Sequence, residues 1–225
     1  MHHRKDHPTP LAVGIRAALC ALVLAPAMFS TASAQSLPDA RFCTVDHVAI
    51  ASWALPGALS GPAPCSATAA PGFDASIRDV FNAPLPGRDV ALKFGASGSN
   101  VAVNTNQFSG VTVNCADHSL HQVTNAAGDV HFVPRFGRYE ETPVIQVIVQ
   151  TILVKTIEAR SPDYDGDGLV GLADFTTFSS DYLDPNGGRP RSDFNDCPGV
   201  TLADFAFFSG QYLASAGQPA EAICP

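Results

Sequence analysis

The sequence predicts a mainly β protein: an antiparallel β-sandwich followed by a small α-helical module of two similar loop–helix repeats. Two observations predict this class. Between residues 72 and 159, about seven short segments alternate apolar and polar residues or are rich in β-branched residues, as strands are. From residue 161 to 213, one segment occurs twice, each time with acidic residues first and an amphipathic helical pattern after them.

The first 34 residues are typical of a secretory signal peptide. Arg4, Lys5 and Arg16 form a basic head, residues 17–29 form a short apolar run, and residues 32–34 (ASA) provide a small-residue cleavage site. The apolar run is shorter than a membrane-spanning helix needs. We therefore expect cleavage near Gln35 and a secreted or cell-surface protein that does not span the membrane.

The net charge argues against nucleic acid as a partner. The whole chain carries −8 at neutral pH, and the expected leader contributes +2, so the exported chain would be near −10. An acidic protein lacks the cationic surface that phosphate backbones require. The excess carboxylates are instead suited to binding a hard cation such as calcium.

The exported chain would keep five cysteines, and an oxidising compartment allows them to form disulfides. Connectivity cannot be read from a sequence, but we favour the pairs that are close in sequence: Cys197 with Cys224, and Cys43 with Cys65. Cys115 would then be left over as a small buried apolar residue.

Residues 35–71 and 72–159 differ sharply in composition. The first segment is rich in Ala, Pro, Ser and Gly, and we interpret it as a loosely structured lead-in. The second is the predicted sandwich, which is large enough to bury one core. Its strands are predicted within residues 73–80, 89–94, 110–115, 121–124, 129–133, 143–150 and 152–159.

Two stretches of the predicted sandwich, DVFNAPLPGRDVALKF and VTNAAGDVHFVP, resemble the hairpins of bacterial immunoglobulin-like (Ig-like) and carboxypeptidase-regulatory-like modules. The first hairpin turn would use residues 82–87, and the second residues 125–128. The resemblance implies an Ig-like sandwich that acts as a non-catalytic spacer or adhesive unit.

The first repeat carries the pattern of a calcium-binding loop at residues 163–174, here called loop one. Calcium takes six to eight oxygen ligands, and a 12-residue loop provides them from positions 1, 3, 5, 7 and 12. Gly168 at position 6 permits the positive φ that the turn needs. The expected ligands are Asp163, Asp165, Asp167, Asp174 and the carbonyl group of Leu169.

The second loop, residues 193–204 or loop two, lacks part of this pattern. Asp193, Asn195 and Asp204 keep positions 1, 3 and 12, but Cys197 and Pro198 occupy positions 5 and 6. A proline cannot adopt the glycine turn, and a thiol is a poor calcium ligand. We expect loop two to bind calcium weakly or not at all. The alternative is that Asp196 or the Gly199 carbonyl completes the site.

The repeat pair, residues 161–225, resembles the dockerin module, in which two such EF-hand-like calcium loops are each followed by one helix. The resemblance implies binding to a cohesin-like protein module through loop positions 10 and 11, here Leu172, Ala173, Leu202 and Ala203. Many dockerins carry Ser-Thr there, so these apolar residues favour a different partner or docking on the protein's own sandwich. The other apolar residues of the two helices are expected to pack on one another.

Catalysis is not predicted. No two carboxylates of the predicted sandwich are marked as a glycosidase pair, and no Ser-His-Asp signature stands out. We favour a secreted, non-catalytic modular protein that uses its repeat pair for attachment or assembly. The second hypothesis is a carbohydrate-binding or polysaccharide-degradation accessory protein, although the only tryptophan, Trp53, lies in the lead-in. The third is a purely structural surface protein whose repeat pair docks on its own sandwich.

Overall fold

A computed structural model describes residues 36–54, 72–95, 100–186 and 189–224. They belong to one compact unit, Ser36–Pro225. The expected leader, residues 1–34, and the expected partner of Cys43, Cys65, lie outside the described residues. None of the helices in the described ranges has the length and apolar character that crossing a membrane demands.

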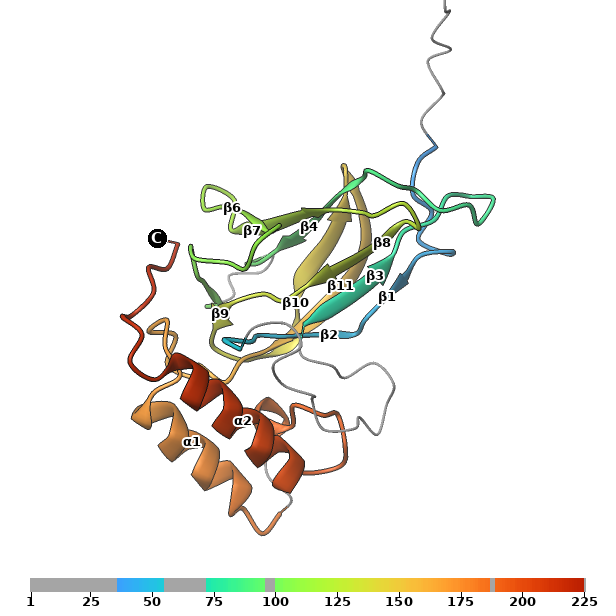
Figure 1. Cartoon of the computed structure of the whole chain (residues 1–225). Coiled ribbons are helices and arrows are strands. Elements are labelled where there is room, and N and C mark those ends of the chain that lie inside the picture. The colour runs from blue at the N-terminus through green and yellow to red at the C-terminus, as the bar shows by residue number, and fades with distance from the viewer. Residues whose placement is uncertain (1–35, 55–71, 96–99, 187–188, 225) are drawn as a thin grey trace, which may run out of the picture. The chain divides into compact units, whose positions relative to one another are not determined.

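A mainly β region with a strongly curled mixed sheet occupies residues 44–160 (Figure 1). Its strands are β1 (Thr44–Val45), β2 (Val48–Ile50), β3 (Phe73–Ser76), β4 (Asp89–Lys93), β5 (Ala102–Val103), β6 (Thr112–Asn114), β7 (Ser119–Val123), β8 (Asp129–Phe132), β9 (Phe136–Gly137), β10 (Glu140–Val149) and β11 (Ile152–Arg160). They form a six-stranded sheet in the order β2-β11-β10-β4-β7-β6, a three-stranded sheet β1-β3-β8 and the pair β5-β9.

Each of the seven predicted strands is present, because alternation of apolar and polar residues carries through to burial. In β3, for example, Phe73 and Ala75 are buried while Asp74 between them is exposed. The strands described within the predicted sandwich pair with one another in antiparallel fashion, as expected. The sheet is nevertheless mixed, because β2 of the lead-in pairs in parallel with β11. The prediction that the lead-in lacks regular structure is wrong for its described part, since β1 and β2 both join sheets. Val48 and Ile50 are fully buried there.

The two predicted hairpins instead connect different sheets. β3 pairs with β1 and β8, whereas β4 pairs with β10 and β7, so residues 77–88 carry the chain from one sheet to the other. Residues 124–128 do the same between β7 and β8. Gly128 is required at this crossing, because its φ is +79° and a Cβ there would lie 2.7 Å from the Ile77 carbonyl oxygen.

Two helices follow the β region, α1 (Leu172–Tyr182) and α2 (Leu202–Ser215), with a short 3-10 helix η1 (Pro190–Ser192) between them. Both helices have an aspartate as their third residue, Asp174 in α1 and Asp204 in α2. The carboxylate of each accepts a hydrogen bond from the backbone N–H of the N-cap residue. They lie side by side (Figure 1), and the rings of Phe178 and Phe208 stack with centroids 4.7 Å apart. The predicted packing of the two helices on each other is confirmed.

The repeat pair shares one hydrophobic core with the β region. Gln211 of α2 is buried, and its Oε1 accepts hydrogen bonds from the backbone N–H groups of Trp53 and Ala54 at 2.6 and 3.1 Å. Trp53 is buried as well. The lead-in thus connects the last helix to β2.

Candidate metal centre

Loop one is folded by its own carboxylates. Asp163 is fully buried and accepts hydrogen bonds from the backbone N–H groups of Gly166 and Gly168 at 2.7 and 3.0 Å. Gly168 has the expected positive φ, +88°. Asp174, in the first turn of α1, accepts from the N–H groups of Tyr164 and Gly171 at 2.6 and 2.7 Å. Acids at positions 1 and 12 thereby close the loop on itself.

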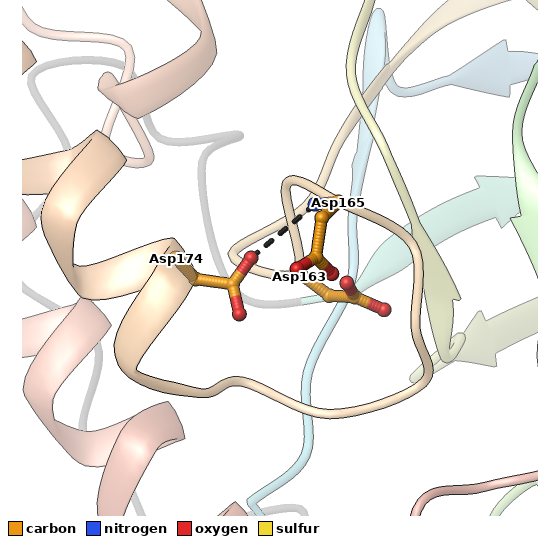
Figure 2. Close-up of side chains that lie close together, drawn as sticks. All are labelled: Asp163, Asp165 and Asp174. Carbon is orange, nitrogen blue, oxygen red and sulfur yellow. Dashed lines mark hydrogen bonds between the residues drawn. The ribbon is translucent and has the colours of Figure 1, made fainter.

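Three carboxylates of loop one converge on one point. Asp163 and Asp165 lie inside the loop, and Asp174 reaches toward them from the start of α1 (Figure 2). One oxygen from each lies within 4.8 Å of the others. Calcium–oxygen distances of about 2.3–2.6 Å place two ligands of one ion at most about 5 Å apart, so this spacing fits a single cation. No other trio of His, Cys, Asp or Glu side chains in the described ranges lies as close.

The other two predicted ligands lie beside this group. Asp167 is exposed, and its Oδ1 accepts a hydrogen bond from the N–H of Leu169 at 2.9 Å. Leu169 is half-buried. Neither belongs to the converging trio, so the structure assembles three of the four predicted carboxylates and leaves Asp167 at the rim of the loop.

The electrostatics of the trio favour a bound cation. Burial is the main cause that raises the pKa of Asp163 to about 8, and the neighbouring Asp174 carboxylate adds to it. Burial raises the pKa of Asp174 too. Two buried acids at this distance repel each other when both are ionised, and a divalent cation removes that repulsion.

The β region forms one wall of loop one, a feature that the sequence did not predict. The backbone N–H of Arg138 donates to the carbonyl oxygen of Asp163 at 2.6 Å, and its Nε donates to the Asp165 carbonyl at 3.3 Å. At Gly137, a Cβ would lie 2.5 Å from Asp163 Oδ2. Gly137 is the last residue of β9, which pairs with β5, and Arg138 follows it in the chain. No sequence motif links these two residues to the loop.

Loop two keeps the backbone frame of loop one. Asp204 accepts from the N–H groups of Phe194 and Asn195 at 2.7 and 3.1 Å, as Asp174 does from its counterparts. Asp193 accepts from the N–H of Cys197 at 3.1 Å. The positive φ occurs at Gly199, +84°, one position later than in loop one, because Pro198 cannot adopt it. Burial raises the pKa of Asp193 to about 6.

A cation from the β region already lies against loop two. Arg160, the last residue of β11, is nearly buried, and its guanidinium donates to the Asp193 carbonyl and to Asp196 Oδ1. His47 Nε2 lies 3.0 Å from the other Asp196 oxygen. Asp196, which could have completed a second metal site, is therefore paired with side chains from the β region.

Replacing Arg160 with methionine is expected to destabilise the protein by about 3 kcal/mol, because it leaves the Asp196 carboxylate and the Asp193 carbonyl without their buried partner. Urea denaturation measures the change. Arg189→Met is the matched control, because Arg189 is exposed and forms only a weak ion pair, with its Nε 4.0 Å from Asp184 Oδ2. Equal stabilities of the two variants would contradict the role given to Arg160.

Both predicted disulfides are wrong. Cys224 pairs with Cys115, and Cys43 has a free thiol. Cys197 is disulfide-bonded as well, but not to Cys224. Proximity in sequence failed as a guide because the C-terminal tail runs back along β5, which brings Cys224 to the end of β6. A disulfide of this kind is typical of extracytoplasmic proteins.

The predicted partner residues lie on the surface at the helix N-termini. Leu172 and Leu202 are 71% and 70% exposed. Ala173 is exposed, and Ala203 is half-buried. The pattern of exposed leucines at equivalent positions follows the sequence repeat.

One further polar chain on β4 and β7 was missed because it joins separate strands. Asp89 Oδ2 lies 2.9 Å from His121 Nδ1, and His121 Nε2 lies 2.8 Å from Ser119 Oγ, the order of a hydrolase triad. However, Ser119 is 1% exposed, and its hydroxyl donates to Asp117 at 2.5 Å. A nucleophile needs an open approach, so we interpret this chain as a network that holds the strands together.

Comparisons with known protein families, with curated proteins and with solved structures gave no match for this chain.

Proposed function

We propose that the chain is a secreted, non-catalytic modular protein whose repeat pair binds one calcium ion in loop one and serves attachment or assembly. The convergence of the Asp163, Asp165 and Asp174 oxygens within 4.8 Å carries this proposal. The pairing of Asp196 with Arg160 supports a single ion, because loop two then has a protein cation beside it. The exposed Leu172 and Leu202 would be the contact residues for a cohesin-like partner.

We further propose that the β region is an Ig-like sandwich that spaces or presents the repeat pair. Support comes from its two larger sheets and from the connections that pass between them. The carbohydrate-binding alternative has less support, because Trp53 is buried against Gln211 and offers no stacking surface.

Asp163→Ala is expected to weaken calcium binding by more than about a hundredfold, since it removes the buried carboxylate at the centre of the loop. Isothermal titration calorimetry of the full chain, exported so that its disulfides form, provides the measurement. Asp117→Ala, an acid outside the repeats, should bind calcium like the wild type. Tight calcium binding by the Asp163 variant would refute the proposed site.

A purely structural role is the second candidate, and the shared core and the docked C-terminal tail favour it. The two roles differ in their dependence on the exposed leucines. If the protein serves attachment, a partner should bind in the presence of calcium and not in its absence. A Leu172→Glu/Leu202→Glu variant of unchanged stability should no longer bind that partner. A structural role gives no such partner in pull-downs from the extracellular fraction, with or without a chelator.

A further inference from the structure

The last residues of the chain form a strap that is anchored to the β region. The N–H of Thr105 donates to the Ala222 carbonyl at 2.7 Å, and the N–H of Cys224 donates to the Val103 carbonyl at 2.7 Å. The tail therefore adds a single antiparallel bridge, Ile223 to Asn104, beside the β5–β9 pair. The Cys115–Cys224 disulfide, which joins residues 109 positions apart, fixes its end next to β6. We call residues 218–224 the tail strap.

The tail strap also touches the metal loop. A Cβ at Gly168 would lie 2.5 Å from the carbonyl oxygen of Glu221 and 3.1 Å from its nitrogen, so the backbone of the strap passes directly against position 6 of loop one. The Glu221 carboxylate is nearly buried and is held by an ion pair with Arg135 and by Asn104 Nδ2 at 2.9 Å. The strap is thus fixed to the β region at its contact with the loop and in the residues that follow it.

Loop one lies between two walls that meet at β5. The strap forms hydrogen bonds along one edge of β5. The other edge of β5 pairs with β9, and Gly137 at the end of β9 and Arg138 after it contact Asp163. Opening either wall frees the loop to rearrange. An ion that requires the closed loop binds more weakly when the loop is not already ordered, because ordering the loop then costs conformational entropy.

We infer that the Cys115–Cys224 disulfide and metal binding in loop one are coupled, so that closing the strap tightens calcium binding and calcium favours closing the strap. This inference rests on the proposed calcium site. Linkage requires the coupling to be reciprocal: the factor by which the disulfide changes calcium affinity equals the factor by which calcium changes the disulfide equilibrium. The strap would therefore close most completely where an oxidant and calcium are both present, outside the cytoplasm.

The test compares calcium affinities in competition with a chromophoric chelator. The wild type and a Cys115→Ser/Cys224→Ser chain are expected to differ by about tenfold, within the usual range of coupling between two sites. Cys43→Ser is the matched control, because Cys43 has a free thiol and should leave the affinity unchanged. Glu221→Gln keeps the disulfide but weakens the ion pair with Arg135, and it should give a smaller loss.

A reciprocal measurement uses only the wild type and decides the question if the serine chain does not fold. Mass spectrometry after thiol labelling measures the fraction of Cys115–Cys224 disulfide in a glutathione buffer, with and without calcium. A rise of the disulfide equilibrium constant by about tenfold in calcium is expected. Equal calcium affinity in the two chains, or an equilibrium that calcium leaves unchanged, overturns the coupling alone. A wild type that binds no calcium overturns the proposed site together with it.

Discussion

Saturating calcium is expected to raise the free energy of unfolding of the oxidised chain by about 4 kcal/mol at pH 8, when free calcium is about a thousand times the dissociation constant. The gain should shrink steadily as the pH falls. Asp163 must lose its proton to bind the ion, and burial raises the pKa of that carboxyl to about 8. Below pH 8, the calcium affinity should therefore fall by about tenfold per pH unit for each proton displaced.

The metal-free chain is expected to show the opposite trend, with stability that falls as the pH rises from about 4 to 8. The folded state holds the Asp163 proton more tightly than the unfolded state does, so the stabilisation is complete below the ordinary pKa of 3.8 and is lost by the folded value of about 8. The raised pKa values of Asp174, Asp193 and His131 act in the same direction.

Urea denaturation across this pH range, with calcium and with a chelator, tests both trends. Asp163→Asn is the matched control, because it keeps the shape of the side chain without its titration, and it should flatten the pH dependence of the metal-free protein. Stability of the chelated wild type that rises between pH 5 and 8 would contradict the assignment of a buried, protonated Asp163.

Part of the candidate site could be predicted from the local sequence pattern, and part could not. The spacing of Asp163, Asp165 and Asp174 predicted their convergence because the backbone N–H groups of a 12-residue loop donate hydrogen bonds to the loop's own carboxylates. Arg138 and Arg160 could not be predicted, because each contacts a loop through pairing of distant strands. Local patterns determine the loop, whereas tertiary contacts determine what surrounds it.

The same division explains the fold. Alternation predicted the strands, since burial of every second residue is a local property. It could not predict the mixed sheet, because β2 has only three residues and its parallel partner, β11, lies about a hundred residues later. The disulfide Cys115–Cys224 was missed for the same reason, as the tail strap returns to a strand far back in the sequence.

Phe178→Ala is expected to destabilise the protein by about 3–5 kcal/mol, the usual cost of emptying a buried phenylalanine site. Phe178 is fully buried at the centre of the repeat pair, where its ring contacts those of Phe194, Phe205 and Phe208. Its loss leaves a cavity that rigid neighbouring rings cannot fill. Urea denaturation in saturating calcium measures the cost. Leu183→Ala, at a site that is exposed just after α1, should cost less than about 0.5 kcal/mol.

The unfolding transition of this variant also tests whether the repeat pair and the β region unfold together. Because Phe178 belongs to the same buried cluster as Val147 and Ile157 of the β region, a single transition should move as a whole to lower urea. The signal of the buried Trp53, which reports on the lead-in beside α2, should change at the same midpoint as the far-ultraviolet circular dichroism of the helices and strands. Two separate midpoints would mean that the repeat pair unfolds as an autonomous module, and that its contacts with the β region contribute little to its stability.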